Sequence, residues 1–141
     1  MKIGIVGTGR MGTAIVQRLL DVGHEVQVWN RTVDNAQEAR EAGARWIPAL
    51  GELVNDSEVV ISFLLDNAAV ESVYLGTNGL LTGRVDGGLF VDMSTVSPGT
   101  HGRIAAAMPS RNAGFIECPV SGSISAAPQQ LTGAPYSSPA D

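Results

Sequence analysis

The chain has 141 residues, of which 44% are hydrophobic and 16% charged, and its formal net charge is −5. This length accommodates one domain with a hydrophobic core but not two ordinary domains. The acidic balance and the scattered Lys and Arg residues argue against a nucleic-acid partner, which requires a basic face. No apolar run approaches the roughly 20 residues of a transmembrane helix, so no membrane partner is expected.

Cysteine content and the start of the chain predict the compartment. Cys118 is the single cysteine, so no intramolecular disulfide can form, which suits the reducing cytosol. The sequence enters its first predicted strand at once, which leaves no room for a signal peptide. We therefore expect a cytoplasmic protein, and we expect no metal site.

The first 32 residues predict a strand, a glycine-rich turn, a helix and a second strand. Lys2–Val6 is a short apolar run, and the sequence GTGRMG follows directly at residues 7–12. Apolar residues then recur near the helical period, and Glu25–Trp29 alternates as a strand does. A G-x-G-x-x-G turn in this context is the fingerprint of a dinucleotide-binding site.

Each glycine of this turn is expected to have a different structural role. Gly7 permits the sharp bend, Gly9 lets a pyrophosphate approach the backbone, and Gly12 allows the helix to pack closely on the sheet. The first N–H groups of the helix then face the phosphates, assisted by the positive end of the helix dipole. The alternative is a sharp turn in another kind of α/β protein.

The end of the second predicted strand selects the cofactor. NAD-preferring sites place Asp or Glu there to hold the ribose 2′-OH, whereas this chain has Asn30, Arg31 and Thr32. Arg31 can pair with a 2′-phosphate, and Asn30 and Thr32 can donate further hydrogen bonds. The sequence therefore predicts NADP(H) in preference to NAD(H); the alternative is a solvated arginine beside a helix start.

Further strands and helices alternate along the rest of the chain. Strands are expected at residues 44–47, 59–64, 89–93 and 115–118, with helices at 33–41 and 50–54 and after the N-caps Asp66 and Ser97. The expected buried residues of the last two helices are Val70, Val73 and Tyr74, and Ile104, Ala105 and Met108; Leu80 and Leu81 anchor the loop at 76–88. This alternation predicts an α/β fold, a doubly wound Rossmann-type parallel sheet of about six strands with helices on both faces.

The sequence changes character after residue 118. Residues 119–141 contain four prolines and no charged residue before Asp141, and their apolar residues follow neither the helix nor the strand period. We expect an irregular, disordered tail. The predicted organisation is a cofactor-binding domain at 1–120, followed at 121–141 by a remnant of a substrate loop and this tail.

Hydroxyl side chains follow the last two predicted strands. Ligands of an open α/β sheet lie beyond the carboxyl ends of its strands. Ser94 and Thr95 follow the strand at 89–93, and Ser121 follows the strand at 115–118. These hydroxyls would lie near a nicotinamide ring and a small polar substrate, although each residue type also occurs in ordinary caps and turns.

Four motifs together resemble the β-hydroxyacid dehydrogenases, a family that includes 3-hydroxyisobutyrate dehydrogenase, tartronate semialdehyde reductase and 6-phosphogluconate dehydrogenase. The motifs are GTGRMG at 7–12, NRT at 30–32, DMSTVSP at 92–98 and PVSGS at 119–123, and the resemblance covers residues 1–127. Imine reductases are similar in their first half, through residues 29–32 and 64–66. The motifs at 92–98 and 119–123 fit the β-hydroxyacid dehydrogenases better.

The resemblance implies roles for individual residues. The implied cofactor-binding residues are Gly7, Thr8, Gly9, Arg10, Met11, Gly12, Asn30, Arg31, Thr32, Leu64, Leu65 and Thr95. The implied substrate-binding residues are Ser94, Thr95, Ser121, Gly122 and Ser123, which would contact carboxylate and hydroxyl groups. The family usually has a second glycine in place of Ser123, so the backbone of that loop departs from the pattern.

The family's catalytic lysine is missing. That lysine belongs to a helical C-terminal domain which we expect to be absent here, and Lys2, the single lysine, is expected at the opposite end of the sheet. His24 is expected on the surface at that same end. His101 is expected on the correct side, but nothing in the sequence shows that it reaches a substrate. General acid/base catalysis is worth about 10²–10⁴-fold, so the chain alone is expected to be nearly inactive.

Two functions are therefore compatible with the sequence. The chain is either the cofactor domain of an oxidoreductase that transfers a hydride between NADP and a small 3-hydroxy acid, or a non-catalytic NADP-binding module. A small carboxylate substrate would bind only together with a helical partner domain. A domain fragment, a shifted reading frame and a natural short protein would all give this pattern.

Overall fold

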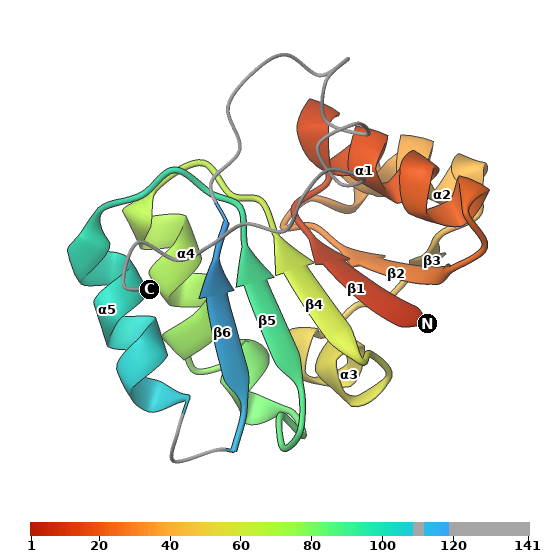
Figure 1. Ribbon diagram of the computed structural model, residues 1–141. Helices are drawn as coiled ribbons and strands as arrows, with labels where there is room; N and C mark the ends of the chain where they lie inside the picture. Colours follow the sequence, from red (N-terminus) through yellow and green to blue (C-terminus); the bar gives the residue numbers. More distant parts are fainter. Residues whose placement is uncertain (109–111, 119–141) are drawn as a thin grey trace.

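The computed structural model describes residues 1–108 and 112–118 (Figure 1). The described strands form one six-stranded sheet in the order β3-β2-β1-β4-β5-β6, and every neighbouring pair is parallel. They are β1 (Lys2–Val6), β2 (Glu25–Trp29), β3 (Arg45–Trp46), β4 (Val59–Ser62), β5 (Leu89–Asp92) and β6 (Gly114–Glu117). This order is that of the doubly wound dinucleotide-binding fold, which confirms the predicted fold class.

Helices cover both faces of the sheet. The first face carries α1 (Arg10–Asp21) and α2 (Gln37–Ala42), and the second carries α3 (Leu50–Asn55), α4 (Asn67–Leu75) and α5 (Pro98–Ala107). Figure 1 shows α4 and α5 beside β5 and β6, whereas α1 and α2 lie by β1–β3. Short 3-10 turns at Val33–Ala36 and Leu80–Thr82 complete the connections.

The two hydrophobic cores follow from the strand period. Val60 of β4 packs with α3–α5, and its neighbour Ile61 packs with α1 and α2. Successive strand residues point to opposite faces, so a strand that is buried on both faces is apolar at nearly every position. The run at 59–64 is apolar except for Ser62, which is why it could be recognised as a strand.

Several local predictions are confirmed. Asp66 accepts the Ala69 N–H through Oδ1 at 2.8 Å and so caps α4. Val70, Val73 and Tyr74 are all buried on one face of that helix. The anchor residues Leu80 and Leu81 are also buried in the core.

The predictions about α5 are confirmed only in part. Ser97 is the N-cap residue of the helix, as expected, but its hydroxyl makes no capping bond to the backbone; the side-chain oxygen of Asn67 accepts the Ser97 N–H at 2.8 Å. Ala105 is exposed, and the buried face of the helix contains His101 with Ile104. The face of α5 that is buried is determined by the polar partner of His101 on β5, described below.

Some predictions lie outside the described residues. These are the site residues Ser121, Gly122 and Ser123 and the expected tail at 121–141. Within the described part of the chain, no helix combines the length and the apolar character that crossing a bilayer requires.

Candidate cofactor-binding site

The glycine-rich turn begins at the end of β1. Gly7 has φ +96°, a conformation that side chains rarely adopt, and a Cβ there would lie 2.1 Å from the carbonyl oxygen of Phe63. Its N–H donates to the carbonyl oxygen of Trp29 at 2.9 Å. Gly7 is therefore required by the fold, because both its backbone conformation and its contact with the chain after β4 exclude a side chain.

The other two glycines differ from each other. A Cβ at Gly12 would lie 2.1 Å from the carbonyl oxygen of Gly7, so this residue lets α1 pack closely on the turn. Gly9 has an ordinary φ of −66°, and no atom lies within 4 Å of its Cβ position. Neither a positive φ nor packing requires a glycine at residue 9, whereas the approach of a ligand to its backbone does.

The N-terminus of α1 suits an anion. No side chain caps this helix, and its first turn contains no acidic residue. The first N–H groups of a helix have no partner within it, and the helix dipole adds positive potential there. Arg10, at the first helical position, is exposed. The residues present therefore fit a cofactor pyrophosphate beside Gly9.

Asn30 joins the turn to the end of β2. Its Oδ1 accepts the Thr8 N–H at 3.0 Å, and its Nδ2 donates to the carbonyl oxygen of Thr32 at 3.0 Å. The Thr8 hydroxyl donates to the carbonyl oxygen of Asn35 at 2.9 Å. Asn30 and Thr8 thus hold the loop that carries Arg31, whose side chain is exposed beside them. This bridging is a positioning role that the sequence did not indicate.

The loop after β4 reaches the same turn. A side-chain carbon of Leu64 lies 3.3 Å from the Cβ position of Gly7, whereas Leu65 is 96% exposed. Met11 is half-buried against the core under α1. Thr95, after β5, is exposed. The structure therefore brings the turn and the loop after β4 together, and it leaves Leu65 and Thr95 open to a ligand.

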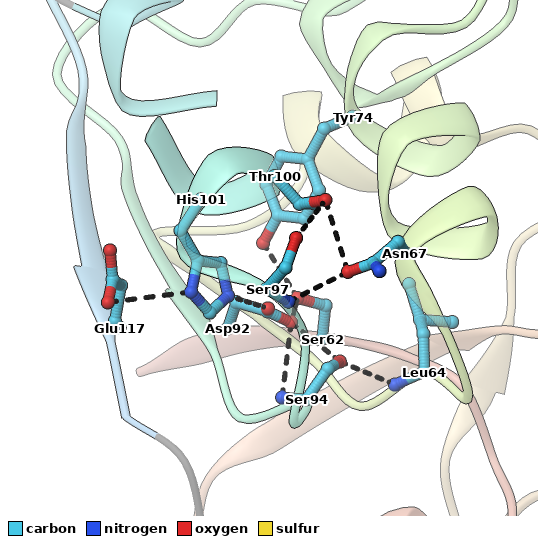
Figure 2. A network of polar contacts seen from close by, with 10 residues as sticks. All are labelled: Ser62, Leu64, Asn67, Tyr74, Asp92, Ser94, Ser97, Thr100, His101 and Glu117. Carbon is cyan, nitrogen blue, oxygen red and sulfur yellow. Dashed lines mark hydrogen bonds and ion pairs between the residues drawn. The ribbon is translucent and has the colours of Figure 1, made fainter. Parts of the chain in front are cut away.

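A buried carboxylate lies behind these loops (Figure 2). Asp92, at the end of β5, has no exposed surface. Its Oδ1 accepts the hydroxyls of Ser62 at 2.7 Å and Ser94 at 2.8 Å. Its Oδ2 lies 2.6 Å from Nε2 of His101. Sequence reasoning missed this cluster, although a charged residue ending an apolar strand and a histidine nine positions later were visible.

The hydroxyl groups of this cluster donate their hydrogen bonds towards Asp92. Ser62 donates its single hydroxyl proton to Asp92, so the contact of 2.7 Å between the Ser62 and Tyr74 hydroxyls must be donated by Tyr74. Burial, together with the charge of Asp92, raises the pKa of the Tyr74 phenol above its usual range. Tyr74 therefore remains a hydrogen-bond donor at any ordinary pH.

His101 is enclosed by carboxylates. Nε2 faces Asp92, and Nδ1 lies 3.4 Å from Oε2 of Glu117. The residue is 4% exposed, so neither ring nitrogen is free to serve a substrate. Lys2 is at the start of β1, at the other end of the sheet, and His24, expected on the surface there, is half-buried. None of these three side chains therefore offers a free acid/base at the carboxyl edge of the sheet.

The sequence matches the NAD binding domain of 6-phosphogluconate dehydrogenase over residues 2–133. It is 40% identical over 121 residues to the cytokine-like nuclear factor N-PAC of Xenopus tropicalis, covering 86% of this chain and 23% of that protein. The structure resembles Mycobacterium tuberculosis 3-hydroxyisobutyrate dehydrogenase with L-serine, with a TM-score of 0.82 and 28% identity, covering 91% of this chain and 43% of that one. It also resembles Psf3 in complex with NADP+ and 2-OPP, with a TM-score of 0.81 and 36% identity, covering 87% of this chain and 44% of that one.

The matches cover most of this chain but less than half of each related protein. This chain spans 23% of the length of the N-PAC relative and 43% and 44% of the two solved structures. The similarity therefore concerns a nucleotide-binding domain within longer proteins.

Proposed function

Because the chain belongs to the family of the NAD binding domain of 6-phosphogluconate dehydrogenase, we propose that it binds NADP(H) as the cofactor half of an oxidoreductase. The substrate would be a small 3-hydroxy acid, of the 3-hydroxyisobutyrate or tartronate semialdehyde type. The observation that carries the proposal is the start of α1, where an uncapped helix N-terminus meets the open space beside Gly9. The family match over residues 2–133 confirms the resemblance that the four sequence motifs indicated.

The preference for NADP(H) rests on the end of β2. Arg31 is exposed there, and Asn30 is fixed to the glycine turn, so the guanidinium extends from a loop of defined position. A 2′-phosphate would gain a bidentate partner from Arg31 and would meet no carboxylate. One solved relative was determined with NADP+, which supports the same preference.

Binding experiments test this preference. We expect the unmutated chain to bind NADPH at least about tenfold more tightly than NADH, since a charge-assisted hydrogen bond contributes about 1.5–3 kcal/mol. Arg31→Ala should remove most of that difference without weakening NADH binding. Arg40→Ala, an exposed arginine of α2, is the matched control and should change neither affinity. Equal affinities for NADPH and NADH in the unmutated chain would refute the proposed preference.

Catalysis requires a general acid/base, and neither His101 nor Lys2 is placed to serve as one. His101 is enclosed, and Lys2 is at the far end of the sheet. Hydride transfer would therefore depend on a partner domain that supplies a general acid/base. On the substrate side, Thr95 is the exposed described residue among the predicted contacts, whereas Ser94 is buried. The contacts of Ser94, Ser121, Gly122 and Ser123 with a substrate remain predictions.

The enclosure of His101 and the position of Lys2 favour a second candidate, a non-catalytic NADP(H)-binding module. An imine-reductase-like domain is a further alternative, because residues 29–32 and 64–66 suit that family also. Adding NADPH with short semialdehydes, or NADP+ with 3-hydroxy acids, to the isolated chain separates catalysis from binding. Turnover clearly above background would contradict the expected inactivity of the chain alone.

A further inference from the structure

Two loops at the carboxyl edge of the sheet are tied to each other. The loop after β4 contains Leu64, and the loop after β5 contains Ser94. The Leu64 N–H donates to Oγ of Ser94 at 2.7 Å, and the Ser97 N–H donates to Oδ1 of Asn67 at 2.8 Å (Figure 2). The relative position of the loops therefore depends on the orientation of the Ser94 and Asn67 side chains.

Asp92 determines the orientation of Ser94. The Ser94 hydroxyl donates its single proton to Oδ1 of Asp92 at 2.8 Å and accepts from the Leu64 N–H. Ser94 is 1% exposed. The Ser94 hydroxyl therefore uses both its proton and an acceptor position for bonds within the protein, whereas the neighbouring Thr95 is exposed.

Stability alone does not explain a buried carboxylate at this point. Taking Asp92 and His101 out of water carries a large desolvation penalty, and apolar residues of similar size often give equal or greater stability. The carboxylate does, however, supply what no apolar residue can, namely oriented acceptors for Ser62 and Ser94. Those acceptors lie directly behind the loops that would hold the ligand.

We propose that Asp92, with His101 as its partner, is a positioning residue for the cofactor site. Asp92 fixes Ser94, and Ser94 fixes the amide of Leu64. The Leu64 side chain then stays against the glycine turn, 3.3 Å from the Cβ position of Gly7. In this assignment Ser94 is a support, and Thr95 is the hydroxyl offered to ligand. The inference rests on the proposed binding of NADP(H).

Two substitutions of Asp92 separate positioning from stability. Asp92→Asn keeps an oxygen acceptor for Ser62 and Ser94, and its NH₂ group can donate to His101 in the tautomer that carries its proton on Nδ1. Asp92→Leu fills a similar volume but leaves Ser94 without an acceptor. We expect Asp92→Leu to raise the Kd for NADPH at least about tenfold and Asp92→Asn to stay within about threefold of the unmutated chain.

Two further variants complete the design. Ser94→Ala removes the tie to Leu64 while leaving Asp92 and His101 paired, so it should weaken NADPH binding about as much as Asp92→Leu, and it serves if Asp92→Leu does not fold. Val60→Ala is the matched control. Val60 is buried on the same face of β4 as Ser62, but it does not take part in the hydrogen bonds between Asp92, Ser94 and Leu64. It should lower the melting temperature and leave the Kd unchanged.

Hydrogen exchange of the Leu64 amide gives a readout without cofactor. It should be slow in the unmutated chain, Asp92→Asn and Val60→Ala, and faster in Asp92→Leu and Ser94→Ala. The inference is overturned if the Kd simply follows the melting temperature across these variants, or if Leu64 exchange is the same in all of them. An unmutated chain that does not bind NADPH refutes the proposed function together with this inference; unchanged Kd values in Asp92→Leu and Ser94→Ala refute the inference alone.

Discussion

Replacing Gly9 with alanine should separate cofactor binding from folding. The added Cβ meets no atom within 4 Å, and φ is an ordinary −66°. Alanine gains about 0.4–1 kcal/mol from the lower entropy of the unfolded chain, and it loses a comparable amount because glycine is the better N-cap residue. The free energy of unfolding should therefore change by less than about 1 kcal/mol.

The same methyl group should obstruct the ligand. It would occupy the open space through which a pyrophosphate reaches the first N–H groups of α1. Loss of one charge-assisted hydrogen bond costs about 1.5–3 kcal/mol, which corresponds to roughly a 10- to 150-fold increase in the Kd for NADPH. NADPH fluorescence titration gives the Kd, and urea denaturation followed by circular dichroism gives the stability.

Gly12→Ala provides the contrasting variant. Its Cβ would lie 2.1 Å from the carbonyl oxygen of Gly7, so α1 would have to move away from β1. Overpacking of this kind typically costs about 1–3 kcal/mol, and both stability and affinity should fall. A folded Gly9→Ala variant that binds NADPH as tightly as the unmutated chain would refute the placement of the pyrophosphate beside this residue.

Three further substitutions test the fold around the site. Gly7→Ala should prevent normal folding, since it combines a φ of +96° with a Cβ 2.1 Å from a carbonyl oxygen; a thermal melt like that of the unmutated chain would contradict this. Asp66→Ala should lower the free energy of unfolding by about 1 kcal/mol through loss of the bond to the Ala69 N–H at 2.8 Å, and an unchanged urea midpoint would show that the cap contributes nothing. Burial raises the pKa of Tyr74, so above about pH 10 the unfolded chain releases this proton while the folded chain keeps it. Stability should then fall with rising pH by up to about 1.4 kcal/mol per unit. Tyr74→Phe should lack this part of the slope between pH 10 and 11, and identical slopes in both chains would contradict the assignment.

The turn at residues 7–12 was the most predictable part of the site. Its glycine spacing, the apolar strand before it and the helical period after it are all local in sequence. The structure shows that the three glycines are present for different reasons. Gly7 and Gly12 are required by packing, whereas Gly9 faces open space. That distinction needs the position of Phe63, which is 56 residues away along the chain.

Helix α5 shows where the sequence pattern failed. Counting apolar residues placed Ala105 in the core and treated His101 as a possible free base. The structure buries His101 because Asp92, on the preceding strand, supplies a partner for its ring. An apolar periodicity cannot anticipate this, because the burial of a polar residue depends on a partner that only the packing of helix on sheet provides.

The sequence by itself determined the class of fold, the glycine-rich start of α1 and the absence of a carboxylate at the end of β2, because these are properties of neighbouring residues. The tertiary structure decided which polar groups are free and which are committed. It turned the hydroxyl of Ser94 inward to Asp92, left Thr95 exposed, and enclosed His101 between Asp92 and Glu117. These outcomes depend on contacts between β5, β6 and α5, where hydrogen-bond partners are set by distance in space, which spacing along the chain does not specify.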